Sequence, residues 1–291
     1  MLSAVIQGIL MGAIYGLIAL GLTLIFGIMK VINFGHGAFL MVAMFIGYYC
    51  VALLGLNPYV SMIIVVPFMF LLGYIINHFL VQKVLQKEAD TREPIGALLL
   101  TAALGIIFEN GGLGLFGTEY KTIHTSFANK SLEFGSVIIT YPKLFAFILC
   151  IIVTIIFYIF LHRTEIGRKI RAVGQDRNAA RLMGINVGKT FNIAFGVGTA
   201  LLGTAAISLI PFYNIHPTIG ASFGTLAFVT VVLGGLGSIP GAIIAGLIIG
   251  IVESVSSLFV PYTLSMMVVL YGFLIFLFIR PSGLFGSPHD W

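Results

Sequence analysis

The sequence opens with residues 1–30, MLSAVIQGILMGAIYGLIALGLTLIFGIMK, in which Lys30 is the first charged residue. This uncharged run is longer than the about 20 residues that a helix needs to cross a bilayer. It also lacks the basic start and the short apolar core of a cleavable signal peptide. We therefore expect this stretch to be the first of several membrane-spanning helices.

The composition extends this interpretation to the whole chain. Of its 291 residues, 59% are hydrophobic and 9% are charged, with a mean hydropathy of +1.11, whereas a soluble domain has about 25% charged residues. The apolar segments are continuous rather than alternating, which disfavours a membrane β-barrel. Cys50 and Cys150 lie inside apolar runs without metal-ligand spacing, so we interpret both as buried small hydrophobic residues.

Nine spans fit the chain, which we treat as a single transmembrane domain of residues 1–291. They cover approximately residues 4–28, 36–54, 58–82, 95–116, 143–161, 191–210, 221–237, 239–259 and 263–280. Glycine and proline interrupt residues 30–40 and 210–240, so broken or re-entrant segments are expected there, packed inside protein or lining a cavity. The predicted fold class is an all-α polytopic membrane protein with about eight or nine transmembrane helices.

The distribution of basic residues predicts the orientation. The segment 162–190 holds seven Lys and Arg residues against two acidic residues, and short loops rich in Lys and Arg stay in the cytoplasm. We therefore place this segment and the C-terminus in the cytoplasm, and the N-terminus outside. The segment 117–142 becomes an external loop, and its residues 134–141 have β character.

Small residues recur at four-residue spacing in two of the predicted spans. Gly8, Gly12 and Gly16 form one ridge, and Ala242, Gly246 and Gly250 form another. Such ridges let helix backbones approach closely in lipid. The ridges predict either packing inside this bundle or an interface with another permease subunit.

Two polar, glycine-rich breaks interrupt the apolar runs, at residues 27–38 and 234–242. Paired broken helices often flank the substrate path of a transporter, which makes Asn33, Gly35, His36 and Gly37 pathway or hinge candidates. No acidic residue or second histidine stands near His36 in sequence, so catalysis is not indicated. The alternatives are a hydrogen-bonded helix break, in which the side chains satisfy freed backbone groups, and a gate.

Two acidic residues fall inside predicted spans, Glu109 in the fourth and Glu253 in the eighth. An ionisable group within the membrane is costly, and is a functional candidate by default. A partnered structural role or a contact with another subunit are the alternatives for each.

The cytoplasmic segment contains a short predicted helix. Asp176 suits an N-cap, Ala179, Ala180 and Leu182 are helix formers, and Gly184 suits the end of the helix. Two turns of helix are not stable alone, so the membrane surface or a groove on a cytosolic partner must hold them, and a groove would receive Leu182 and Met183.

The stretch 184–190, GINVGKT, approaches a phosphate-binding loop but has three residues between its first glycine and the Gly-Lys pair. The motif needs four residues there and a preceding strand. We therefore do not expect ATP binding by this chain.

Four ordered motifs resemble one family. The pattern at 176–185 is similar to the coupling loop of ABC importer permeases, and residues 15–37, 232–242 and 280–286 (RPSGLFG) resemble the branched-chain amino acid (hydrophobic amino acid and amide) permeases. The resemblance implies a non-catalytic subunit in the bacterial inner membrane, without catalytic residues, metal or cofactor of its own.

In that family, ATP and Mg are bound by two cytoplasmic ATPase subunits. The implied partners are these ATPases, a second permease subunit, a periplasmic or surface solute-binding protein and the lipid bilayer, with no nucleic acid. The expected coupling surface comprises Gly167, Arg168, Arg171, Asp176, Ala179, Ala180, Leu182, Met183 and Gly184. The alternative is a self-sufficient channel or secondary transporter for a small polar solute such as urea or an amide.

Overall fold

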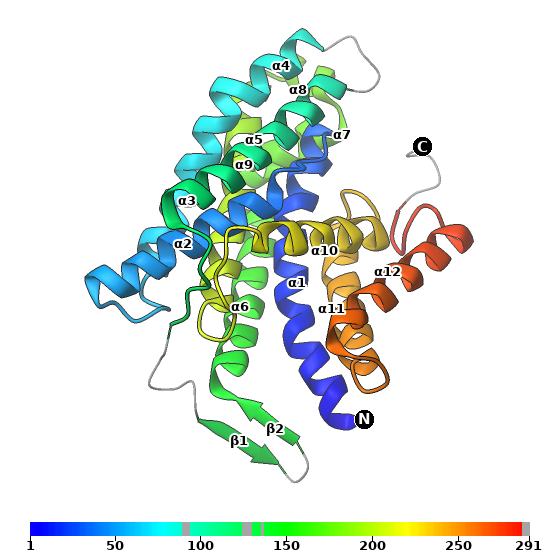
Figure 1. Cartoon of the computed structure of the whole chain (residues 1–291). Coiled ribbons are helices and arrows are strands. Elements are labelled where there is room, and N and C mark those ends of the chain that lie inside the picture. The colour runs from blue at the N-terminus through cyan, green and yellow to red at the C-terminus, as the bar shows by residue number, and fades with distance from the viewer. Residues whose placement is uncertain (89–93, 124–129, 135–136, 287–291) are drawn as a thin grey trace.

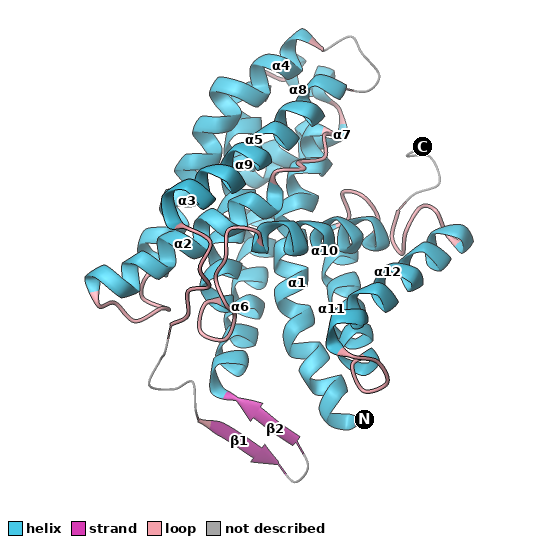
Figure 2. Ribbon diagram, viewed as in Figure 1, coloured by secondary structure: helices cyan, strands magenta, loops and turns pink. Residues whose placement is uncertain are grey.

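The computed structural model of the chain describes residues 1–88, 94–123, 130–134 and 137–286. Helices dominate it, and two short strands form an antiparallel hairpin (Figures 1 and 2). The elements are α1 (Leu2–Met29), α2 (His36–Leu54), α3 (Met62–Ile76), the π-helical turn η1 (Asn77–Val81), α4 (Gln82–Lys87), α5 (Ile95–Phe116), β1 (Ser131–Phe134), β2 (Val137–Thr140), α6 (Tyr141–Arg163), α7 (Glu165–Gln175), α8 (Arg177–Leu182), α9 (Val187–Leu209), α10 (Ile219–Gly234), α11 (Ile239–Ser256) and α12 (Tyr262–Ile279).

Seven helical segments in the described part of the chain are long and apolar enough to cross a membrane. They are α1, α2, the continuous run Met62–Lys87, α5, α6, α9 and α11. Helix α10 is a shorter apolar helix, and α12 contributes the apolar run Leu264–Ile279. The predicted all-α membrane fold is confirmed. The length of about 20 residues required for a span separates α10 in particular, with its 16 residues, from the full-length spans.

Helices α1 and α9 form the centre of the bundle. About four fifths of the most apolar window of each is buried, 78% for α1 and 83% for α9, against 17% for α5 and 22% for α6. Because lipid tails are as apolar as leucine, the peripheral helices can leave Ile and Leu side chains exposed without cost. The centre must instead be closely packed, and α1 has eight glycine or alanine residues that allow close packing.

The two predicted glycine ridges pack against each other along α1 and α11. A Cβ atom on Gly12 would lie 2.7 Å from the Leu247 Cα, and a Cβ atom on Gly250 would lie 2.6 Å from the Gly12 Cα. Real Cβ atoms do not approach backbone atoms so closely, which explains glycine at these positions. Of the two alternatives for the ridges, the structure shows packing within the chain.

The first glycine-rich break is a reversal of the chain. Lys30 ends α1 in the left-handed conformation with φ of 52°, and residues 31–35 return toward the middle of α1, where α2 begins. The His36 Nε2 atom lies 2.9 Å from the Ile18 carbonyl oxygen of α1, and Asn33 Oδ1 accepts from the Gly35 amide at 3.1 Å. Asn33 thus serves the break locally, while His36 binds a neighbouring helix.

Helix α10 also begins beside the middle of α1. The Tyr15 and Phe223 ring centroids are 6.3 Å apart, and the first turns of α2 and α10 cross where Gly37 and Gly220 meet backbone to backbone. The spatial counterpart of the first break is therefore the segment 210–219. The second predicted break, 234–242, is a turn between α10 and α11 in which Gly235 and Gly237 have φ of 100° and 83°.

The two ends of the bundle carry different structures. The N-terminus and the β-hairpin lie at one end, and α4, α7 and α8 lie at the other (Figure 1). The expected external loop includes residues 124–129 and 135–136, and the predicted cytoplasmic C-terminus falls in 287–291; these lie outside the described residues. In the described part of the loop, β1 and β2 pair with Ser131 opposite Thr140.

Candidate functional site

At one end of the bundle, α7 and α8 form a capped helix pair. The Thr164 hydroxyl accepts from the Gly167 amide at 3.0 Å and begins α7. Asp176 Oδ1 accepts from the amides of Asn178 (2.7 Å) and Ala179 (3.0 Å) and begins α8. The chain leaves α8 through Gly184, which has φ of 78°, so the predicted helix at 176–184 has its expected cap and its expected glycine.

The sequence analysis did not predict helix α7. Its first signal is Thr164, an N-cap residue type, and its second is the apolar spacing of Ile170 and Val173, both 1% exposed. Four charged residues within α7 obscure that spacing. Gly167 lies where any side chain would overlap the Leu161 and Phe160 carbonyl oxygens, so this coupling-surface candidate has a packing role.

The helix pair is tied to the end of α1 by Arg177. Its Nη2 atom donates to the Met29 carbonyl oxygen at 2.6 Å, and its guanidinium lies 5.2 Å from the Phe191 ring centroid of α9. The last carbonyls of a helix lack partners within it, and Arg177 satisfies one of them. Burial, and then the neighbouring Arg181, lower the pKa of Arg177, but an arginine stays charged at any physiological pH.

The outer face of the pair is both basic and apolar. Leu182 and Met183 are 90% and 82% exposed, while Ala180 is buried against the bundle. Ala179, Arg168 and Arg171 are also exposed. Lys169 forms an exposed i,i+4 ion pair with Glu165 at 2.6 Å, and this hydrogen bond lowers the pKa of the Glu165 carboxyl. Two large apolar side chains in water beside a row of cations are typical of an interaction surface.

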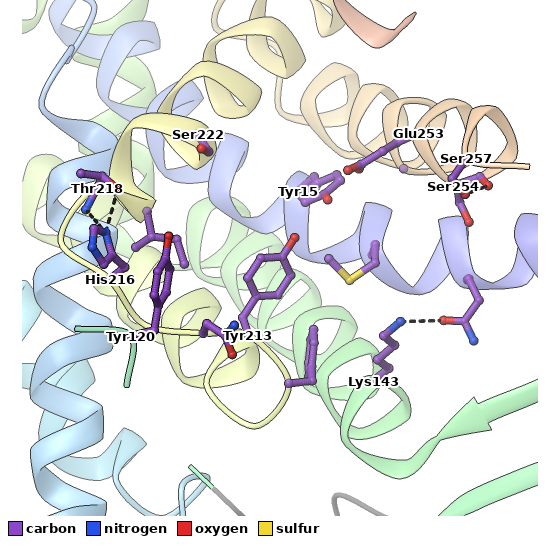
Figure 3. A pocket seen from close by; sticks show the side chains of 16 residues that line it. Tyr15, Tyr120, Lys143, Tyr213, His216, Thr218, Ser222, Glu253, Ser254 and Ser257 are labelled. Atoms are coloured by element: carbon purple, nitrogen blue, oxygen red, sulfur yellow. Dashed lines mark hydrogen bonds between the residues drawn. The ribbon is translucent and has the colours of Figure 1, made fainter. Parts of the chain in front are cut away.

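Toward the opposite end lies a cavity of about 670 Å³, which we call the outer cavity. Figure 3 shows that its labelled side chains come from α1, α6, α11 and its C-terminal end, the segment 210–222, and the segment that follows α5, which contributes Tyr120. Glu253 extends from α11 toward Tyr15 of α1, whose hydroxyl donates to the carboxyl group. Lys143 of α6 donates to Gln7 Oε1 at 3.0 Å. The predicted pathway residue Glu253 therefore lines a cavity.

The rim of the outer cavity is organised around His216. Its Nδ1 lies 2.8 Å from the Thr218 hydroxyl, and its Nε2 lies 2.9 Å from the Thr118 carbonyl oxygen. The Tyr120 ring stacks on it with centroids 4.5 Å apart. Contacts between the segment that follows α5 and the start of α10 thus fix one side of the opening.

A second cavity of about 390 Å³, the central cavity, contains most of the other pathway candidates. Asn33, His36, Gly37 and Glu109 all line it, with apolar side chains around them. Gly35 is not among its lining residues and instead packs against Thr101 of α5, where a Cβ atom would lie 2.7 Å from a carbonyl oxygen. The structure therefore brings Glu109 to the first break and places Glu253 elsewhere.

The sequence did not single out Lys143, Tyr15 or Gln7. Lys143 begins the expected span 143–161, and Tyr15 and Gln7 are isolated polar groups in a long apolar run. A faint signal exists, because Tyr15 and Gln7 lie eight residues apart and therefore on similar faces of a helix. Among the described residues, no group of three or more His, Cys, Asp or Glu side chains is placed to hold a metal ion.

Comparison with known proteins identifies the family to which this chain is related. A family model described as "Branched-chain amino acid transport system / permease component" matches residues 4–279. The chain is 30% identical to the high-affinity branched-chain amino acid transport system permease protein BraD of Pseudomonas aeruginosa, over 99% of this chain and 96% of that protein. It is 31% identical to the probable branched-chain amino acid transport permease protein LivH of Methanocaldococcus jannaschii, over 94% and 89%.

A solved structure, "PsaBC from Streptococcus pneumoniae in complex with Fab", has a related fold. Its TM-score is 0.51 at 15% sequence identity, and the match covers 95% of this chain and 91% of that one. Together with the seven apolar helices, these matches describe a multi-pass membrane protein. The chain belongs to the family of permease components of branched-chain amino acid transport systems.

Proposed function

We propose that the chain is the membrane subunit of an ABC importer and forms part of the pathway for branched-chain amino acids. The observation that carries the proposal is the helix pair α7–α8, in which Leu182 and Met183 are 90% and 82% exposed beside a basic face. Membership of the family and the relatives' names support the solute class. The chain acts without catalysing a reaction itself.

The proposed assembly has four kinds of component. A second homologous permease subunit completes the pathway, and two cytoplasmic ATPases dock on the coupling surface and bind ATP and Mg. A periplasmic or surface solute-binding protein delivers the amino acid at the end that carries the β-hairpin. In this arrangement residues 162–190 face the cytoplasm of a bacterium, the external loop 117–142 and the N-terminus lie outside, and the C-terminus lies inside.

The proposed mechanism is alternating access. Closure of the ATPases moves α8, and Arg177 carries the movement to the end of α1 through its bond to Met29. Helix α1 also holds His36 at Ile18 and Glu253 at Tyr15, so its displacement reaches both cavities. ATP and the loaded receptor shift the balance between outward and inward states only because each binds the two states differently.

The docking step can be tested by changing one exposed residue. Leu182→Asp adds a charge where the side chain is solvent-exposed, so the permease should still fold while losing the ATPases on co-purification. Leu258→Asp is the matched control, since Leu258 is an exposed leucine (53%) at the opposite end of the bundle. Retention of the ATPases and of uptake by Leu182→Asp would reject this docking surface.

A self-sufficient channel or secondary transporter is the second candidate. It is favoured by the two acidic residues that line cavities, Glu109 and Glu253, since embedded carboxylates often bind coupling ions or protons. Reconstitution of this chain alone decides between the candidates. Solute flux in the absence of ATPases and of a second permease supports the channel, and flux only with the full complex and ATP supports the importer.

A further inference from the structure

The outer cavity holds two opposite charges that do not form an ion pair. Lys143 and Glu253 both line it, and among the described residues the one ion pair within 4.0 Å is that of Glu165 with Lys169. Both side chains belong to apolar helices of membrane-spanning length. Charges placed in this way normally pair with one another, so their separation by a cavity calls for an explanation.

Neutral groups hold the two charges in place. Lys143 donates to Gln7 Oε1 at 3.0 Å, and Gln7 Nε2 in turn donates to the Ile138 carbonyl oxygen of β2 at 2.8 Å. The Tyr15 hydroxyl donates to the Glu253 carboxyl. Each of these contacts orients a charge without neutralising it, and an ammonium group has three donors. Lys143 therefore retains donors, and Glu253 retains acceptors, for a further partner.

The rest of the lining is divided between apolar and hydroxyl groups. Met11, Phe212 and Ile219 contribute apolar surface, and Ser254 and Ser257 contribute hydroxyls beside Glu253 on α11 (Figure 3). At about 670 Å³, the cavity lies within the range of about 300–1,000 Å³ that is usual for small-molecule sites. Such sites combine mostly apolar walls with a few placed polar groups.

We propose that the outer cavity binds the transported amino acid as a zwitterion, with Glu253 accepting from its ammonium group and Lys143 donating to its carboxylate. The aliphatic side chain then lies against the apolar wall. A zwitterion supplies both missing counter-charges at once, which a cation, an anion or a neutral amide does not. This inference rests on the proposed function and names the residues that contact the solute.

The central cavity lacks this complementarity. Glu109 lines it, but none of the described residues around it is a lysine or an arginine. An amino acid there would have a carboxylate for its ammonium group and no cationic side chain for its own carboxylate. Glu109 therefore provides the matched control for Glu253, because both are acidic residues on apolar helices that line cavities.

The direct test uses the complete importer in proteoliposomes with L-leucine as the probe. Glu253→Gln and Lys143→Gln should each lower uptake by about tenfold or more, since each removes a charged hydrogen-bond partner, and Glu109→Gln should lower it far less. Assembly and the ATPase activity stimulated by the loaded receptor should persist in all three. Unchanged uptake in Glu253→Gln and Lys143→Gln would overturn the site; absence of ATP-dependent uptake by the parent complex would instead refute the proposed function.

A specificity readout separates contact with the solute from a structural role. N-acetyl-leucine lacks the ammonium group, and leucinamide lacks the carboxylate. Glu253→Gln should lower the ratio of leucine uptake to N-acetyl-leucine uptake. Lys143→Gln should lower the ratio of leucine uptake to leucinamide uptake. Equal loss for leucine and both analogues in either variant would assign that residue to the structure of the cavity and overturn its proposed contact.

A third measurement keeps the proposal testable if the Gln variants fail to assemble. Ser254→Cys places a thiol in the cavity, and Ser131→Cys places one on the exposed hairpin, while the native Cys50 and Cys150 are buried. Saturating L-leucine should slow modification of Cys at 254 by a charged thiol reagent about fivefold or more, in keeping with the burial of a ligand in its pocket, and leave position 131 unaffected. Equal modification rates at 254 with and without leucine would overturn the site.

Discussion

The helix pair α7–α8 and the outer cavity differ in how far apart their residues lie in the sequence. The helix pair is built within residues 164–184, and its caps join atoms two or three residues apart. The outer cavity joins Gln7 of α1 to Lys143 of α6, 136 residues away, and Tyr15 to Glu253 of α11. The helix pair can therefore be predicted from local sequence, whereas the outer cavity forms only when the distant helices pack together.

Because of this difference, we expect substitutions to affect the helix pair and the outer cavity to different degrees. A local helix pair depends on its caps, on the few buried side chains of α7 and α8, and on Arg177, so that the loss of any one of these has limited cost. A cavity between distant helices depends on the whole seam that sets their spacing, and α1 and α11 meet along glycines that leave no room for a methyl group. Three variants test this difference, in decreasing order of the change that each should cause.

The largest effect should come from the seam. Gly246→Ala combined with Gly250→Ala forces backbone atoms of α1 away from α11, and overpacking costs about 1–3 kcal/mol per site. We expect a large fall in thermal stability in detergent, measured by size-exclusion chromatography after heating, and loss of the outer cavity. The matched control is Gly111→Ala with Gly272→Ala, where an added Cβ meets no atom within 4 Å. An equally stable seam variant would contradict the packing.

A smaller effect should follow from Arg177→Gln. The change removes the donor to the Met29 carbonyl oxygen, and an unsatisfied buried polar group costs about 1–3 kcal/mol. We expect ATPases to remain bound while ATP hydrolysis no longer drives uptake, measured as amino acid transported per ATP hydrolysed. Arg163→Gln is the control, because Arg163 is an exposed arginine at the same end of the bundle and lies outside the expected coupling surface. A normal ratio in Arg177→Gln would show that the tie to α1 carries no movement.

The smallest effect should come from Asp176→Ala. The change removes the N-cap of α8, and loss of a cap costs about 1 kcal/mol. We expect weaker ATPase binding, by about fivefold, measured as the ATPase concentration at half-maximal assembly, with an intact outer cavity. Asp176→Asn should restore most of the affinity, because asparagine is an equally good cap. Failure of asparagine to rescue would mean that the negative charge, rather than the cap, is required.

The sequence predicted the class of fold, the glycine seam and the cap of α8 because each depends on features that repeat over a few residues. Uncharged runs longer than a bilayer specify spanning helices, and four-residue glycine spacing specifies close helix contact. The sequence did not reveal α7, because charged residues cover its apolar face. It also paired residues 27–38 with 234–242, whereas in the structure the start of α2 meets the start of α10.

For the candidate site, the sequence alone selected Glu253, Glu109 and His36 as polar groups too costly to leave unexplained in an apolar chain. That Glu109 and His36 line one cavity, and that Glu253 lines another with Lys143 and Tyr15, follows from the tertiary structure. The physical reason is that helical periodicity fixes the face of a side chain within its own helix. Which distant helix covers that face depends on the packing of the whole bundle.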